Sequence, residues 1–178
     1  EQVEALRGYA FLTEKPMLIV ANVAESEAVD GGAFAESLSS RYGDMGVLVV
    51  SAQIEAEISQ LEAEERDAFL QDMGLGKSGA DRLVHAAYEL LDLITFYTLA
   101  NDKLQSWQLP RGTTAPTAAG HIHSDMEAGF VRAEVTTADD LEEAEGHLSR
   151  LREVGRLRAE GRDYAICDGD VVTFLFKN

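Results

Sequence analysis

An apolar run that follows a proline, PMLIVANV at residues 16–23, sets the architecture of the first half of this chain. Such a run is typical of a strand buried on both faces, because a strand with one solvated face alternates apolar and polar residues. A second run, GVLVVS, occupies residues 46–51. Between them Phe34, Leu38 and Tyr42 recur every four residues, which predicts a helix over about 32–42 that ends at Gly43. Strand, helix and strand in so short a span predict a βαβ unit with parallel strands and a right-handed crossover.

Two further helices are expected to complete this first domain. One is predicted from about Glu55 to Met73, with Gly74 placed to end it. The next begins at Ser78, whose hydroxyl can cap it, with Asp81 in the capping-box position. The apolar stripe of this last helix consists of Leu83, Val84, Ala87 and Leu91.

From residue 94 onwards the hydrophobic period changes to two, which indicates a second domain. ITFYT and LQSWQL flank Ala100-Asn101-Asp102 and predict a β-hairpin. A short helix is expected to start at Pro116, continue to about Met126 and end near Gly129. Further strands are predicted at 130–135 and within 164–176, around a turn at 168–170. These elements predict a small α+β roll.

The charge of the chain is strongly acidic and unevenly distributed. The net charge of −17 comes from 15 basic and 32 acidic residues, with −12 on residues 1–93 and −5 on residues 94–178. Such a chain is not expected to bind nucleic acid non-specifically. The local exception is a cluster of five arginines: Arg150, Arg152, Arg156, Arg158 and Arg162. Two interpretations stay open, a solvated helix face paired with Glu153 and Glu160, or a docking patch for RNA or a partner.

The cellular setting is predicted from the length of the apolar runs, the first residues of the chain and its cysteine content. No apolar run approaches the roughly 20 residues that cross a bilayer, and the start EQVE carries neither an initiator Met nor a signal-peptide pattern. We therefore expect a cytoplasmic, monomeric protein without membrane contact, whose chain starts inside a longer sequence. The single Cys167 excludes an internal disulfide and is interpreted as a small apolar filler in a half-buried strand.

Gly76-Lys77-Ser78 invites comparison with the phosphate-binding loop G-x-x-x-x-G-K-[ST]. The first glycine of that pattern would fall on Gln71, and the preceding residues belong to an acidic helix rather than to a strand. A phosphate loop needs a strand before it, so that its amides converge on phosphate at the start of a helix. We therefore interpret Ser78 as a helix cap, and the chain as lacking a phosphate loop.

His121, His123 and Asp125 are candidate ligands for a metal ion. On a strand all three side chains would point to one side and could bind a metal. On a helix the two histidines diverge by about 200° and the site is lost. Pro116 and the small residues that follow it favour the helix. No metal site is therefore expected, and His123 is interpreted as a structural or docking residue.

Polar residues follow each of the two buried strands. Asn22-Val23-Ala24-Glu25 comes after the first strand and Ser51-Ala52-Gln53 after the second. Loops at the carboxyl ends of parallel strands collect ligands, and two such loops can contact both sides of one base. Together they resemble the fourth and fifth motifs of G-protein-like NTPases, N-K-x-D and S-A-K, with Val23, Glu25 and Gln53 departing from them.

These departures bear on the choice of base. In a GTPase the aspartate accepts from both N–H donors of the guanine edge, whereas adenine presents an acceptor at N1 and a donor at N6. A carboxylate aimed at the adenine N1 would be repelled, while an Asn amide can donate to N7 and accept from N6.

The sequence N-x-x-E at residues 22–25 resembles the pattern of the YchF (Obg-like) ATPase family. LTEKPMLIVANVAE, SAQIEAEISQL, RGTTAPTAAG and GRDYAICDGDVV also resemble segments of that family in order, so that the resemblance extends from residue 12 to 178.

The resemblance implies a fold in three parts. Residues 1–11 would be the end of a helical arm. Residues 12–93 would be the C-terminal part of a G-domain-like P-loop NTPase with a parallel sheet. Residues 94–178 would be a TGS domain, an α+β module of β-grasp type. The base would be contacted by Asn22, Val23 through its backbone, Glu25, Ser51, Ala52 and Gln53.

The resemblance also implies a function. We expect the complete protein to be a ribosome-associated regulatory ATPase that prefers ATP to GTP and uses Mg²⁺, and the 178-residue chain to be inactive alone. Its P-loop, Mg²⁺ ligands and catalytic histidine match nothing in these residues, and phosphoryl transfer depends on such groups. Ribosome or RNA contact would fall to residues 94–178, with the Arg150–Arg162 region as the candidate. Two alternatives stay open: a non-catalytic module that binds RNA, the ribosome or a protein, and a GTPase.

Overall fold

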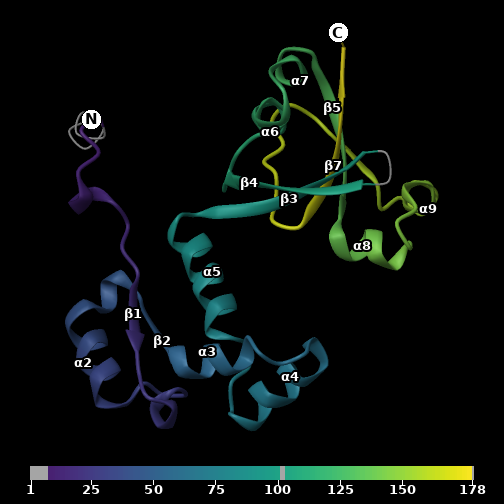
Figure 1. The fold of residues 1–178 in the computed structure, drawn as a ribbon. Helices are drawn as coiled ribbons and strands as arrows, with labels where there is room; N and C mark the ends of the chain where they lie inside the picture. The colour runs from purple at the N-terminus through teal and green to yellow at the C-terminus, as the bar shows by residue number, and fades with distance from the viewer. Residues whose placement is uncertain (1–7, 101–102, 178) are drawn as a thin grey trace. The chain divides into compact units, whose positions relative to one another are not determined.

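The computed structural model describes residues 8–100 and 103–177, which divide into two compact units between Leu91 and Asp92 (Figure 1). The predicted end of a helical arm falls mainly on residues 1–7 and lies outside the described residues. The described chain starts with a short 3₁₀ turn, η1 (Leu12–Glu14). None of the helices in the described part of the chain is long and apolar enough to cross a membrane.

The centre of the first unit is a pair of parallel strands, β1 (Ile19–Asn22) and β2 (Val47–Val50). They pair from Ile19↔Val47 to Asn22↔Val50, and η2 (Glu25–Glu27) and α2 (Gly32–Tyr42) connect them. The parallel strand-helix-strand prediction is therefore confirmed. The helix α2 ends at Tyr42 with Gly43 as its C-cap residue, as predicted; Gly43 keeps a helical φ of −54° and begins the 3₁₀ turn η3 (Gly43–Met45). The chain turns into β2 at Gly46, whose φ of +75° favours glycine.

The single helix predicted over 55–73 is wrong. The structure has two, α3 (Ala52–Ile58) and α4 (Ala63–Asp72). The break has a local cause, because the Ser59 hydroxyl and the Gln60 amide both donate to the Ala56 carbonyl, at 2.8 and 3.2 Å. Side-chain bonds of this kind compete with the helical ladder. Gly74 ends α4 as predicted, with a φ of +71°. The core of this unit consists of Ala28, Ile54, Ile58, Leu70 and Leu75.

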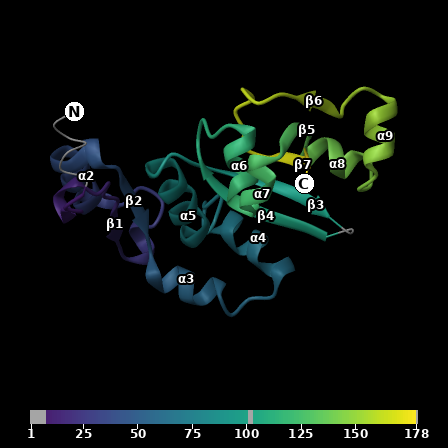
Figure 2. The same cartoon turned by 90° about the horizontal axis from the view of Figure 1, so that it is seen from above.

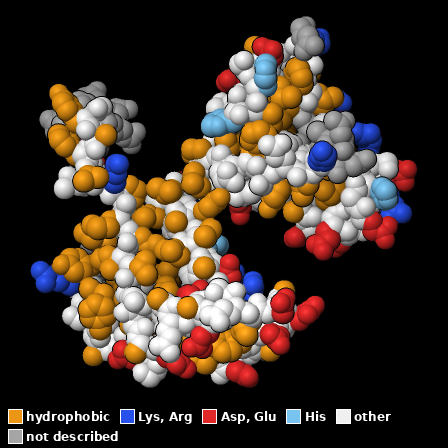
Figure 3. Space-filling model, in the orientation of Figure 1, with side chains coloured by type: hydrophobic (Ala, Val, Ile, Leu, Met, Phe, Trp, Pro, Cys, Tyr) orange, Lys and Arg blue, Asp and Glu red, His pale blue; other side chains and the backbone are white. Residues whose placement is uncertain are grey.

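The last helix of the first unit is α5 (Gly79–Leu90). Its predicted cap is confirmed, since the Asp81 N–H donates to the Ser78 hydroxyl oxygen at 3.0 Å. Its apolar stripe is not buried as expected: Leu83, Val84 and Leu91 are exposed, and Val84 is 59% exposed. Figure 3 shows hydrophobic side chains at the surface around β1, α2 and α5. The hydrophobic period correctly located an apolar face on α5, but the described residues that pack against this helix cover another of its faces.

The second unit is built on one mixed sheet with the strand order β4-β3-β7-β5-β6. β3 pairs antiparallel with β4 and parallel with β7, and β5 pairs antiparallel with both β7 and β6. The β3–β4 pairing confirms the predicted hairpin, although the tip residues 101–102 lie outside the described part. β6 was not predicted, because three residues are too few to show a period. The strands are β3 (Leu93–Ala100), β4 (Lys103–Pro110), β5 (Phe130–Thr137), β6 (Arg158–Glu160) and β7 (Asp170–Phe176).

Helices cover both faces of this sheet (Figures 1 and 2). On one face α6 (Ala115–Ile122) packs against Phe96 and Val172. On the other, α8 (Ala138–Glu143) and α9 (Leu148–Glu153) pack against Val171. Consecutive residues of a strand point to opposite faces, which separates the two clusters. The helix predicted from Pro116 is interrupted at His123, whose extended backbone separates α6 from α7 (Ser124–Ala128).

Candidate nucleotide base site

The two predicted ligand loops lie side by side at the carboxyl ends of β1 and β2. Asn22 is the last residue of β1 and pairs with Val50, the last residue of β2. The Asn22 side-chain oxygen accepts the Ala52 N–H at 3.0 Å, and the Val23 N–H donates to the Val50 carbonyl at 2.9 Å. Hydrogen bonds therefore join segments that are thirty residues apart in the sequence.

Asn22 also caps a helix that it does not belong to. Ala52 is the first residue of α3, and its N–H has no partner within the helix. Ser51, at the N-cap position, makes no side-chain cap bond, so Asn22 supplies the acceptor. This contact orients the amide, because the reverse orientation would set its amino group against an N–H donor. The Asn22 amino group is left to donate elsewhere.

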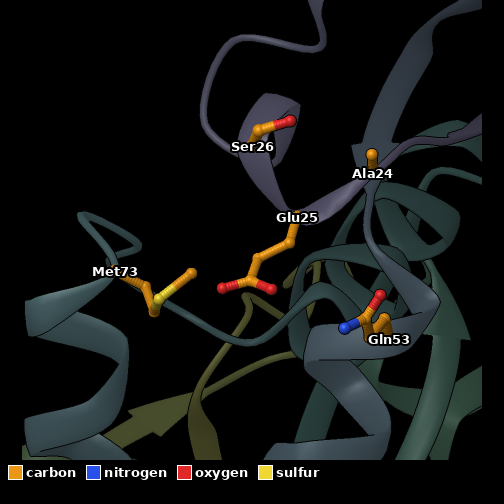
Figure 4. A pocket seen from close by; sticks show the side chains of 5 residues that line it. All are labelled: Ala24, Glu25, Ser26, Gln53 and Met73. Atoms are coloured by element: carbon orange, nitrogen blue, oxygen red, sulfur yellow. The ribbon is translucent and has the colours of Figure 1, made fainter.

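A cavity of ≈ 460 Å³ opens next to these strand ends. Figure 4 shows the Glu25 carboxylate extending into the space between Met73 and Gln53. Glu25 comes from η2, Gln53 from the first turn of α3, and Met73 directly follows α4. The cavity therefore offers an anionic acceptor, an amide and an apolar thioether, a mixture suited to the edge and the face of a planar heterocycle.

Of the six predicted site residues, Glu25 and Gln53 line this cavity together with Ala24, Ser26 and Met73. Of the other four, Val23 and Ala52 directly precede the lining residues Ala24 and Gln53, and Asn22 and Ser51 lie one position further back in the chain. The backbone N–H of Val23 is used within the sheet, which leaves its carbonyl for a ligand. Sequence reasoning missed Met73, because its place depends on the break between α3 and α4.

Ser51 is the most buried of the predicted residues, with 4% of its surface exposed. Its hydroxyl has no hydrogen-bond partner among the described residues. A buried hydroxyl without a partner costs about 1–3 kcal/mol. Ser51 is the buried N-cap residue of α3 and is not among the residues that line the cavity.

Four of the five arginines in the cluster are paired with carboxylates of the second unit, whereas Arg162 donates to the Phe130 carbonyl at 3.0 Å. Arg150 pairs with Glu145 at 2.7 Å, and Arg152 with Glu134 at 2.8 Å. Arg156 contacts two carboxylates, and Arg158 lies 3.4 Å from Glu160, as predicted. The charged side chains of α8 are all acidic and those of α9 are mainly arginine, and red and blue side chains lie close together in this part of Figure 3. Only Arg150 and Arg152 lie on α9, so a continuous arginine face on one helix is wrong.

The turn at 168–170 contains a buried carboxylate. Asp170 is 2% exposed and accepts from the Tyr164 hydroxyl and the Cys167 N–H, both at 2.8 Å. Burial, together with this bond to Asp170, raises the pKa of the Tyr164 hydroxyl well above its usual range. Cys167 itself is exposed in the preceding loop, so its interpretation as a half-buried strand residue is wrong.

No metal centre is formed by the described residues, among which no group of three His, Cys, Asp or Glu side chains is placed to bind an ion. His123 has a local role instead. Its Nδ1 accepts the Asp125 N–H at 3.2 Å and so caps α7. This contact agrees with the structural interpretation of His123.

Comparison with known proteins identifies relatives along nearly the whole chain. A family model named YchF-GTPase_C, described as a protein of unknown function, matches residues 93–177. The ribosome-binding ATPase YchF of Bacillus subtilis is 41% identical over 180 residues, which cover 99% of this chain and 49% of the relative. The Escherichia coli O157:H7 protein of the same name is 40% identical, with 99% and 48% covered. Human Obg-like ATPase 1 is 34% identical, with 99% and 45% covered.

Solved structures show the same fold. The Schizosaccharomyces pombe YchF GTPase superposes with a TM-score of 0.81 at 24% identity, covering 98% of this chain and 47% of that one. A GTP-binding protein from Pyrococcus horikoshii OT3 gives 0.62 at 19% identity, covering 92% and 46%. The fold is thus the C-terminal part of a P-loop NTPase followed by a TGS-like unit. The chain spans about half the length of the curated relatives it matches. On this evidence the chain belongs to the YchF family of Obg-like ATPases.

Proposed function

We propose that this chain supplies base recognition and a TGS surface to a ribosome-associated protein that binds and hydrolyses ATP. The observation that carries the proposal is the hydrogen bond from Ala52 to Asn22, which joins two loops beside a cavity lined by Glu25 and Gln53. The activity and the partner follow the names of the relatives, which are ribosome-binding ATPases and an Obg-like ATPase.

The geometry divides the work of base recognition between two side chains. The free amino group of Asn22 can donate to N7, which is an acceptor in both purines and so does not distinguish them. The Asn22 oxygen accepts from Ala52 with one of its two lone pairs, and the Glu25 carboxylate at the cavity supplies a further acceptor for the adenine N6 amino group. No lysine stem covers the base here, because Val23 and Gln53 stand at the two lysine positions. We infer a preference for ATP, with GTP as the competing ligand.

The phosphates and Mg²⁺ would be bound by groups that do not occur among these 178 residues. Gly76-Lys77-Ser78 forms no phosphate loop, since Ser78 caps α5 and Gln71 lies within α4. Contact with the base alone is expected to be weak. We therefore expect the 178-residue chain to bind ATP with a Kd above about 1 mM, equivalent to about 4 kcal/mol.

Calorimetric titration tests this proposal in two samples. The 178-residue chain is titrated with ATP and with GTP, and so is a longer form of the protein that carries a P-loop. The longer form is expected to bind ATP more tightly than GTP, and the short chain to bind neither measurably. Micromolar ATP binding to the 178-residue chain would contradict the assignment of phosphate binding to other residues. Equal affinities for ATP and GTP in the longer form would contradict the base preference.

Ribosome association is assigned to the second unit because its segment carries the smaller negative charge. The arginine cluster is a poor candidate for that contact. Arg152 and Arg156 already contact Glu134, Asp140 and Glu143, and an RNA phosphate would have to displace these carboxylates while being repelled by them. We propose that ribosome contact uses other parts of this unit.

A further inference from the structure

The helix α5 starts on a carboxylate that belongs to α3. The Glu55 side chain accepts the Gly79 N–H at 2.6 Å through one oxygen and the Ala80 N–H at 3.2 Å through the other. These are the first two residues of α5, whose N–H groups have no partner within the helix. A negative charge at this end is also favoured by the helix dipole. Glu55 therefore links two helices that are more than twenty residues apart in the sequence.

Gly79, at the start of α5, lies very close to Glu55 and to the Val50 side chain. A Cβ at position 79 would lie 2.8 Å from Val50 Cγ1 and 2.9 Å from Glu55 Oε1. Both distances are too short for real Cβ contacts, so any side chain here has to displace the side chains of Val50 and Glu55. The start of α5 is thus packed directly against the end of β2, where the base-site loop begins.

The same short helix α3 carries the second half of the candidate base site. It begins with Ala52 and Gln53, and its first N–H donates to Asn22. One turn later Glu55 contacts α5, while its own N–H donates to the Ser51 carbonyl at 3.0 Å. α3 is therefore held at two points, by Asn22 at its first residue and by the contact of Glu55 with α5.

We propose that Glu55 is a positioning residue for the base site. Through Gly79 and Ala80 it sets the position of α3, and with it the distance of Ala52 from Asn22 and of Gln53 from the cavity. The inference rests on the proposed function only for the identity of the ligand. The proposal predicts that weakening the contact of Glu55 with α5 also weakens the hydrogen bond between Ala52 and Asn22. If Glu55 only capped α5, the Ala52–Asn22 bond would not change.

Hydrogen exchange of individual amides in the 178-residue chain, followed by NMR, tests this directly. Glu55→Gln removes the charge and one acceptor oxygen. We expect exchange at Gly79 and Ala80 to accelerate about tenfold, since bonds to charged groups are the stronger ones, and exchange at Ala52 to accelerate severalfold. Glu57→Gln is the matched control, because Glu57 lies on the same helix with its side chain exposed, and it should change none of the three amides.

Two results would overturn the proposal. Unchanged exchange at Gly79 and Ala80 would show that Glu55 makes no lasting contact with α5. Faster exchange at these two with an unchanged Ala52 would reduce Glu55 to a cap. Gly79→Ala provides a second route should Glu55→Gln fail to fold, since the added methyl group displaces the carboxylate and is expected to accelerate exchange at Ala52 as well.

A nucleotide measurement separates this inference from the proposed function. In a longer form that carries a P-loop, Glu55→Gln is expected to raise the Kd for ATP at least about fivefold, and Glu57→Gln to leave it unchanged. An unchanged Kd in Glu55→Gln contradicts the positioning role. Failure of the parent protein to bind ATP would contradict the proposed function instead, and the exchange experiment would still decide on Glu55.

Discussion

Asn22 offers a substitution that separates stability from binding, because its two side-chain groups have different partners. Its oxygen accepts from Ala52 and caps α3, whereas its amino group has no hydrogen-bond partner among the described residues. Asn22→Asp keeps an acceptor for Ala52 and loses the amino donor. Asn22→Ala loses both. We expect Asn22→Asp to fold like the parent and to bind nucleotide poorly, and Asn22→Ala to be impaired in both respects.

The magnitudes follow from the contacts. Losing an N-cap acceptor costs about 0.5–2 kcal/mol, so Asn22→Ala should lower the free energy of unfolding by about 1 kcal/mol. Asn22→Asp should stay within about 0.5 kcal/mol, because a carboxylate at a helix N-terminus is favoured by the dipole. Facing the purine N7, the same carboxylate loses a hydrogen bond and leaves an acceptor unpaired, at about 1.5–3 kcal/mol. The Kd for ATP should therefore rise by roughly 10- to 150-fold.

Stability is measured by urea unfolding of the 178-residue chain, and ATP affinity by calorimetry on a longer form that carries a P-loop. Far-UV circular dichroism follows the helices of both units, of which the first unit has the larger share, while Trp107 fluorescence follows the second unit and serves as an internal control. Parent-like ATP affinity in Asn22→Asp would refute the role of the amino group at the base. Equal loss of stability in both variants would refute the capping role of Asn22.

Three further variants test other parts of the structure. Ser51→Ala removes a buried hydroxyl that has no partner among the described residues, so unfolding in urea should show an unchanged or increased stability, and a loss above about 1 kcal/mol would contradict this. Glu25→Asp combined with Val23→Lys restores N-K-x-D and should shift the ratio of ATP to GTP affinity toward GTP, whereas an unchanged ratio would place base selection elsewhere. Arg152→Gln combined with Arg156→Gln should leave ribosome co-sedimentation and its salt dependence unchanged, while a flatter salt dependence would show that these arginines contact phosphate.

The sequence by itself determined the elements whose signals are local. Two apolar runs around one amphipathic helix determined a parallel β1–β2 pair, and Ser78 with Asp81 determined where α5 begins. The change to a period of two marked the β3–β4 hairpin. Asn22 and Ser51 were predicted to lie together because parallel strands end at one edge, a rule that needs no coordinates. Each of these inferences uses residues that are neighbours along the chain or along one pair of strands.

Only the tertiary structure decided which groups meet across longer separations. The hydrophobic period of α5 revealed an apolar face. It could not show that no described residue covers this face, on which Val84 is exposed. The arginines looked like a positive patch because their counter-charges, among them Glu134 on β5, come from elsewhere in the sequence. The caps that Asn22 and Glu55 provide join residues more than twenty positions apart. No local pattern encodes such contacts, because the N–H groups at a helix N-terminus can donate to any nearby acceptor, and the fold alone determines which acceptor lies there.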